Sequence, residues 1–113
     1  MRREDVIRIR HMIDAGRSAR RFIEKRERSC LDTDQMLLFA LVRAVEIIGE
    51  AASRTTTETQ AATPTIPWAA IVSMRNRLIH AYFDIDRDIL WKTVTEEVPA
   101  LITLLKKLLR REE

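Results

Sequence analysis

Helix-breaking residues are scarce in this 113-residue chain, which contains two glycines and three prolines. Glycine and proline are the strongest local interruptions of regular structure, so their low number favours long uninterrupted elements. Aromatic residues make up 5% of the chain, and Leu, Ile, Val and Ala supply most of the 46% hydrophobic fraction. This balance favours helices over strands. The composition therefore predicts an all-α fold.

Apolar residues recur at helical spacing along four stretches of the chain. The predicted helices cover about 3–28, about 34–53, a short stretch from Pro67 to about His80, and a fourth from about 87 to the C-terminal end. Mostly short connections between four helices indicate an antiparallel helical bundle. A length of 113 residues suits one domain spanning 1–113 and leaves no room for two.

The second predicted helix carries apolar residues on two adjacent stripes, a wider apolar surface than a helix on the protein surface requires. We therefore expect it to be central and largely buried. Its polar exceptions are Arg43, Glu46 and Glu50, which share one face because they are three and four residues apart. That face lies against either solvent or a cleft.

The ends and interruptions of the helices have local signals. Asp32, Thr33 or Asp34 is expected to cap the second helix, and Asp84 or Asp86 the fourth. Pro99 lies inside the fourth helix and is expected to kink it. The Thr-rich segment 54–66 lacks hydrophobic periodicity, so we expect one long and flexible connection there.

Several classes of protein are excluded. The single cysteine, Cys30, allows no internal disulfide and fits a reducing cytosol. No apolar run approaches the roughly 18 residues of a membrane span, so we expect a soluble, cytoplasmic protein. His11 and His80 are far apart and lack the spacing of a metal site, and two glycines cannot build a phosphate-binding loop. We expect no metal and no cofactor.

Positive charge is concentrated at the N-terminal end of the chain. Residues 1–28 contain ten basic and five acidic side chains, and sixteen of the twenty basic residues in the chain are Arg. Arginine suits bidentate contacts with phosphate or carboxylate groups. The segment is therefore either a solvated helix face with intrahelical ion pairs or a surface that binds an anionic partner.

The residues with the most chemical potential lie together between Arg75 and Tyr82. An imidazole such as His80 can move a proton near neutral pH, and the Arg75 guanidinium can stabilise charge on a phosphate. This pairing suits RNA cleavage without a metal. On an ideal helix Arg75 and His80 point about 140° apart, so the helix has to end or loosen between them.

The pattern Arg-x-x-x-x-His-x-Tyr, formed by Arg75, His80 and Tyr82 with Asn76 after the arginine, resembles the signature of HEPN domains, specifically the HepT-like (DUF86) toxins. The stretches VEIIGEAA at 45–52 and IPWAAIVSMRNRLIHAYFDID at 66–86 are also similar to that family, as are Trp91 and the proline at 99. The resemblance covers roughly residues 34–109.

The resemblance implies a helical homodimer with two copies of the motif facing one cleft, and a metal-independent ribonuclease that acts as a toxin on RNA. It also implies a nucleotidyltransferase antitoxin that transfers AMP onto the motif tyrosine. Arg75 and His80 then become catalytic, Asn76 and Tyr82 support or position the substrate, and Tyr82 is the modification site. Glu46 and Glu50 could pair with Arg75 and orient it.

Two other functions remain open from the residues. The chain could be a non-catalytic helical dimer that binds a nucleotidyltransferase partner or a nucleotide without cutting RNA. It could also bind nucleic acid non-specifically through residues 1–28, with an affinity that falls steeply with salt.

Overall fold

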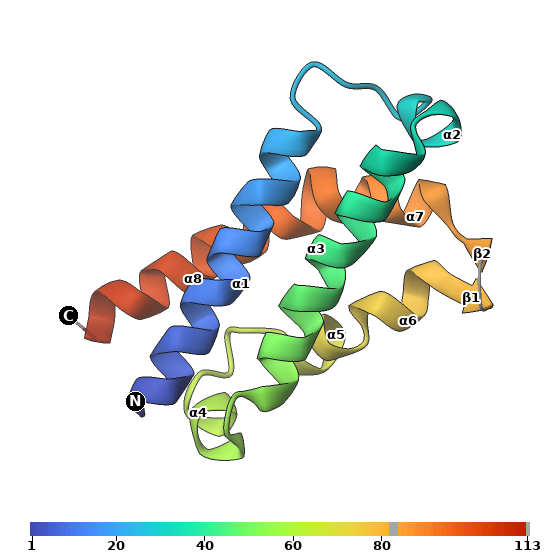
Figure 1. Ribbon diagram of the computed structural model, residues 1–113. Coiled ribbons are helices and arrows are strands. Elements are labelled where there is room, and N and C mark those ends of the chain that lie inside the picture. The colour runs from blue at the N-terminus through green and yellow to red at the C-terminus, as the bar shows by residue number, and fades with distance from the viewer. Residues whose placement is uncertain (82–83, 113) are drawn as a thin grey trace.

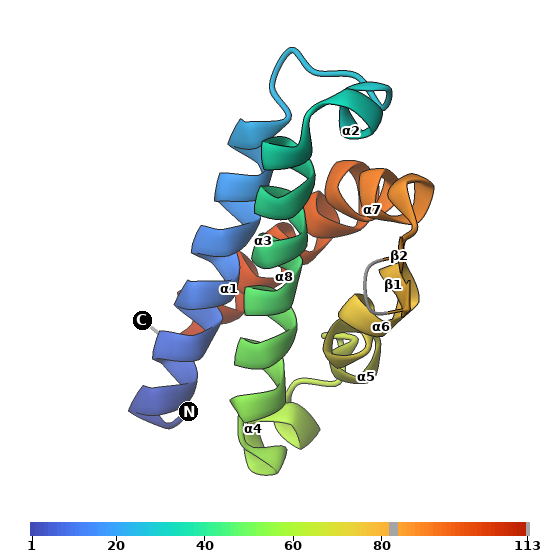
Figure 2. The ribbon, with the colours of Figure 1, turned by 45° about the vertical axis from the view of Figure 1, so that its right-hand side comes forward.

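Two long antiparallel helices form the front layer of the molecule in a computed structural model, which describes residues 1–81 and 84–112 and gives the backbone alone for His80, Ala81 and Glu112 (Figure 1). These helices are α1 (Arg3–Phe22) and α3 (Gln35–Arg54). Helix α8 (Val98–Glu112) crosses behind α1, and the turns α5 (Trp68–Val72) and α6 (Met74–Leu78) pack beside α3 (Figure 2). The predicted all-α fold is confirmed.

The remaining elements are short. They are α2 (Cys30–Thr33), α4 (Thr57–Ala62), strands β1 (Ile79–Ala81) and β2 (Asp84–Ile85), α7 (Arg87–Lys92) and the π-helical turn η1 (Thr93–Glu97). Strands β1 and β2 form an antiparallel pair in which Ile79 faces Ile85. None of the helices in the described residues is both long and apolar enough to cross a membrane.

Helix α3 is central, as its broad apolar surface predicts. It packs against α1, α2, α5, α6 and α7. Leu41, Val45 and Ile48 are fully buried along it. The Asp34 side chain caps its N-terminus by accepting a hydrogen bond from the Leu37 amide at 3.0 Å. That hydrogen bond, followed by the Arg26 guanidinium, holds the pKa of Asp34 below its ordinary value.

The first helix ends earlier than its sequence predicts. It was expected to reach residue 28, but α1 ends at Phe22, and Lys25 adopts a left-handed backbone with φ of 59°. The following arginines form ion pairs with distant acids instead of extending the helix. Arg26 contacts Asp34 at 2.9 Å, and Arg28 contacts Asp88 of α7 at 2.5 Å. Since these partners lie outside the segment, its own composition could not reveal the end of the helix.

The fourth predicted helix is also interrupted, although its apolar stripe is continuous. The interruption is the π-turn η1, and Pro99 follows it in the first turn of α8, where a missing amide hydrogen is tolerated. Leu90, Val94 and Val98 lie four residues apart and are all fully buried. On an ideal α-helix, two steps of four residues would turn the side chain of Val98 about 80° away from that of Leu90 around the helix axis. The wider π-turn compensates for this rotation and keeps both side chains in the core.

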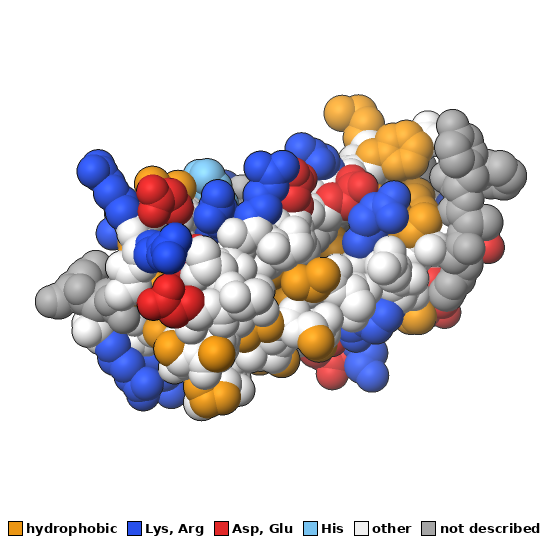
Figure 3. All heavy atoms as spheres, turned by 90° about the horizontal axis from the view of Figure 1, so that it is seen from below, with side chains coloured by type: hydrophobic (Ala, Val, Ile, Leu, Met, Phe, Trp, Pro, Cys, Tyr) orange, Lys and Arg blue, Asp and Glu red, His pale blue; other side chains and the backbone are white. Residues whose placement is uncertain are grey.

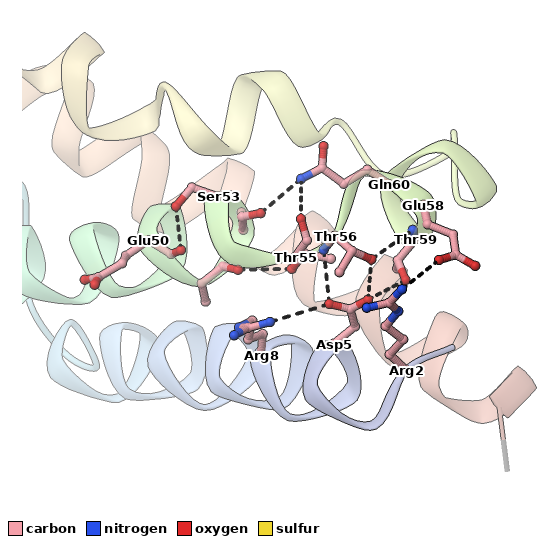
Figure 4. A network of polar contacts seen from close by, with 12 residues as sticks. Arg2, Asp5, Arg8, Glu50, Ser53, Thr55, Thr56, Glu58, Thr59 and Gln60 are labelled. Carbon is pink, nitrogen blue, oxygen red and sulfur yellow. Dashed lines mark hydrogen bonds and ion pairs between the residues drawn. The ribbon is translucent and has the colours of Figure 1, made fainter.

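Segment 54–66 contains helix α4 where a connection without regular structure was expected. Segment 54–66 is anchored by Asp5 of α1, whose side chain is fully buried. One Asp5 oxygen accepts hydrogen bonds from the hydroxyls of Thr56 at 2.7 Å and Thr59 at 2.6 Å, and the other accepts the Thr56 amide at 3.1 Å (Figure 4). Arg8 lies 3.7 Å away. Two of the threonines that suggested a loop, Thr56 and Thr59, are therefore partners of a buried carboxylate.

Replacing Asp5 with Asn is expected to destabilise the fold by about 1–3 kcal/mol at pH 7, because buried donors lose a charged acceptor. Burial raises the pKa of Asp5, but the hydrogen bonds from Thr56 and Thr59 and the charge of Arg8 outweigh it, so the pKa lies below its ordinary value. The stabilisation is therefore complete above the unfolded pKa near 4 and is lost as the pH falls through the folded pKa.

Urea unfolding of both proteins between pH 7 and pH 2.5 measures this difference. The matched control is Asp14→Asn, which changes an exposed aspartate of the same helix and should alter stability by less than about 0.5 kcal/mol at every pH. A gap between wild type and Asp5→Asn that stays constant down to the lowest pH would contradict the assignment.

Candidate functional site

The short helix α6 displays the polar residues of the motif because its two apolar residues are buried. Met74 and Leu78 are one turn apart, and both lie in the core formed by α3, α7 and η1. Arg75, Asn76 and Arg77 between them are consequently exposed. The third predicted helix is thus two short helices, because α5 ends at Val72 and α6 begins at Met74.

Arg75 is oriented by an acidic residue of the central helix. Its Nε donates a hydrogen bond to Glu46 Oε2 of α3 at 2.9 Å. The Arg75 side chain remains 49% exposed, and that of Glu46 is 31% exposed. The guanidinium is therefore held on one edge, while its remaining N–H groups donate to no other described residue and can meet an anion.

A surface pocket of about 370 Å³ opens at this ion pair. Its lining consists of Arg43, Glu46, Gly49, Glu50 and Ser53 of α3 together with Val72 and Arg75. Glu50 shares the pocket but pairs with Arg54 at 3.0 Å, so of the two predicted acids only Glu46 contacts Arg75. The polar stripe of α3 thus lines a pocket as well as meeting solvent.

The helix ends between Arg75 and His80, as the geometry of the motif requires. Ile79 has φ of −112° and ψ of 102°, and the backbone continues as β1, which contains His80. The Leu78 carbonyl accepts the Asp86 amide at 2.7 Å, which closes the base of the segment that carries His80. The placement of the His80 side chain and of Tyr82 lies outside the described residues.

Two contacts near the motif have no signal in the local sequence. Arg77 Nη1 lies 3.1 Å from Glu97 Oε1 of η1, and Thr93 donates to the other Glu97 oxygen at 3.0 Å. Arg77 therefore ties α6 to the π-turn, while Arg75 points toward α3. Only the tertiary structure separates the roles of these two arginines.

The charges around the pocket are mixed. Seen from below, Lys and Arg side chains alternate with Asp and Glu along one edge of the molecule, and hydrophobic side chains gather toward one end of that edge (Figure 3). Among the described side chains no group of three His, Cys, Asp or Glu residues could hold a metal ion.

Asp86 holds the segment around His80 at its C-terminal end. Its side chain caps α7 by accepting the Ile89 amide at 2.9 Å, so Asp86 is the cap among the two predicted candidates.

We expect Asp86→Ala to lower the free energy of unfolding by about 1 kcal/mol, the usual cost of losing such a cap. Thermal unfolding measures the loss. Asp84→Ala, which changes an exposed residue of β2, is the control and should cost less than about 0.5 kcal/mol; equal losses would contradict the assignment.

Comparisons with known proteins show the family of the chain. The family model described as "Ribonuclease HepT-like" matches residues 12–108. A protein of Thermococcus cleftensis named "Probable ribonuclease HepT" is 45% identical over 75 residues, which cover 66% of this chain and 68% of the relative. A "Putative RNase" of Caldanaerobacter subterraneus subsp. tengcongensis is 39% identical over 80 residues, 71% of each chain. Another "Putative RNase", from Methanocaldococcus jannaschii, is 44% identical over 68 residues, 60% of this chain and 62% of the relative. No solved structure matches.

Proposed function

Because the chain belongs to the HepT-like ribonuclease family, we propose that it is a toxin that cuts RNA as a metal-independent endoribonuclease in the cytoplasm. The observation that carries this proposal is the exposed Arg75 guanidinium, held by Glu46 at the edge of a pocket, with its helix ending before His80. An anchored cation beside a residue that can transfer protons suits a reaction at a phosphate diester.

In the proposed reaction the 2′-hydroxyl of a ribose attacks the adjacent phosphorus, and the bond from phosphorus to the 5′-oxygen of the next nucleotide breaks. His80 takes the proton of the attacking hydroxyl or gives one to the leaving oxygen. Arg75 stabilises the negative charge that builds up on the phosphate oxygens. The products are a 2′,3′-cyclic phosphate and a free 5′-hydroxyl.

The other residues of the site position these two groups. The Glu46 carboxylate accepts the hydrogen bond from Arg75 and so keeps the guanidinium at the pocket. Asn76 lies four residues before His80 on the exposed side of α6, where its amide can donate to a phosphate or ribose oxygen. Glu50 shapes the pocket through its ion pair with Arg54.

We also propose that the protein is a homodimer formed through the exposed face of α3. Met36 is 84% exposed and Phe39 55% exposed on that helix, and Arg43 and Glu46 continue the same face at helical spacing. Neighbouring apolar side chains of this size mark surfaces that bind protein. A second copy packed there would cover Met36 and Phe39 and bring a second Arg75 toward the pocket.

The proposed antitoxin is a nucleotidyltransferase that modifies Tyr82. The phenol oxygen of Tyr82 attacks the α-phosphate of ATP, a new phosphorus–oxygen bond forms, pyrophosphate leaves and the phenol proton passes to solvent. AMP beside Arg75 would pair with the guanidinium and repel the phosphates of RNA. The modification would thus occupy the group on which cleavage depends.

Purified protein is expected to cut RNA in the presence of a chelator, and His80→Ala should slow cleavage by about 10²–10⁴-fold, the usual contribution of proton transfer. Arg75→Ala should reduce cleavage comparably, since it removes the anchored cation. Gel analysis of the products, with end-group chemistry to detect the cyclic phosphate, measures both effects.

The matched control is Arg20→Gln, which changes an exposed arginine of α1 outside the pocket that contains Arg75. It should leave the cleavage rate within a few-fold of wild type. Retained cleavage in His80→Ala would overturn the mechanism. Absence of cleavage in wild type would favour the alternative of a non-catalytic dimer that binds the nucleotidyltransferase or a nucleotide.

Incubation with the cognate nucleotidyltransferase and ATP is expected to add one or more AMP groups at Tyr82 and to stop cleavage. Mass spectrometry of the intact protein and of the peptide around residue 82 measures the modification. Tyr82→Phe lacks the phenol oxygen and should remain unmodified, while His80→Ala should still accept AMP. Modification of Tyr82→Phe to the same extent as wild type would disprove the assignment of the acceptor.

A further inference from the structure

A basic groove lies between α1 and α8, on a different flank of α1 from the one that faces α3. Arg8 and His11 line the side of α1 next to α3. Arg10 and Arg17 line the other side, opposite Lys106 and Arg110 of α8. The groove has a volume of about 690 Å³, and Ile13 and Leu109 form its apolar floor.

The four cations of this groove are unpaired within the described part of the chain. No ion pair or hydrogen bond joins the side chain of Arg10, Arg17, Lys106 or Arg110 to a described residue, and all four are exposed. Asp14 lies between the two arginines along α1, yet it too forms no ion pair within 4 Å. Since Asp14 is the acid that lines the groove beside these four cations, the groove carries an excess of positive charge.

Other arginines of the N-terminal segment are paired. Arg2 pairs with Glu58, Arg26 with Asp34, and Arg28 with both Asp32 and Asp88. The structure thus divides the cations of residues 1–28 into those that pair with an acid and those without an acidic partner among the described residues. Arg10 and Arg17 belong to the second group.

Helix dipoles account for Arg110, which lies in the last turn of α8, but not for Arg10 or Lys106. A dipole favours cations in the last turn of a helix, and Arg10 lies in the N-terminal half of α1. Lys106 lies more than one turn before the end of α8.

We propose that the groove between α1 and α8 binds the sugar-phosphate backbone of the RNA, away from the phosphate that is cut. This proposal rests on the proposed RNA substrate. Arg10 and Arg17 are two helical turns apart, about 10 Å, and Lys106 and Arg110 one turn, about 6 Å, so a strand between them meets cations from both walls. The residues that line the groove include no aromatic ring on which a base could stack. The groove therefore holds RNA in place without reading its sequence.

The test measures the binding of single-stranded RNA whose 2′-hydroxyls are methylated, so that the strand cannot be cut. The two groove variants are Arg10→Gln/Arg17→Gln and Lys106→Gln/Arg110→Gln. The control is Lys25→Gln/Lys92→Gln, which removes the same number of charges from exposed residues outside the groove. Affinity is measured at several salt concentrations for each protein.

Each groove variant is expected to reduce the slope of log affinity against log salt by about 1.4, since two phosphate contacts are lost. The ratio of the RNA affinity of wild type to that of a groove variant then falls about seven-fold as the salt concentration rises from about 50 to about 200 mM. The control should keep the wild-type slope. Arg10→Lys/Arg17→Lys retains the charge and should keep most of the slope, which separates electrostatic binding from a defect in folding.

Groove variants that bind the RNA as wild type does would overturn the proposal, as would equal losses in the groove variants and the control. Weaker binding of the nucleotidyltransferase with unchanged binding of RNA would overturn it too, in favour of a protein partner. Cleavage assays with unmodified RNA keep the two proposals separate. If the protein cuts RNA but the groove variants bind it as wild type does, only the groove proposal is refuted. If RNA binding depends on the groove but no RNA is cut, only the ribonuclease proposal is refuted.

Discussion

Burial of α3 on most of its circumference is the constraint on which the rest of the structure depends. Helices α1, α5, α6 and α7 all pack against it, and apolar residues on two adjacent stripes fill the space between them. Only a narrow stripe of α3 is left for polar side chains. Glu46 lies on that stripe, and its position determines where Arg75 of α6 finds a carboxylate. The pairing of Glu46 with Arg75 is thus set by the packing of the core.

Local patterns predicted those parts of the fold that depend on neighbours in sequence. The apolar stripes of α3, a cap within 32–34 and the end of the helix before His80 follow from spacing and turn chemistry within a few residues. Local patterns did not predict the end of α1 or the helix in 54–66, because the contacts that determine both come from distant parts of the sequence. Arg28 pairs with Asp88, sixty residues away, and Thr59 donates to Asp5, more than fifty residues away.

The same division applies to the candidate site. The sequence placed Arg75, Asn76 and His80 at one junction, and it offered Glu46 and Glu50 as equal partners for the arginine. The tertiary structure distinguishes them, since Glu46 contacts Arg75 while Glu50 pairs with Arg54. The charge excess of residues 1–28 is a property of composition, whereas the groove between α1 and α8 exists only because two segments ninety residues apart lie side by side.

The π-turn η1 sets the register between α7 and α8. Leu90 and Val98 are eight residues apart and both face the core, although seven residues would bring an ordinary helix back to the same side. The chain therefore has one residue more here than a regular helix needs. Loss of that residue would keep both ends of the helix in register. It would also abolish the bulge from which Glu97 contacts Arg77 and braces the helix that carries Arg75.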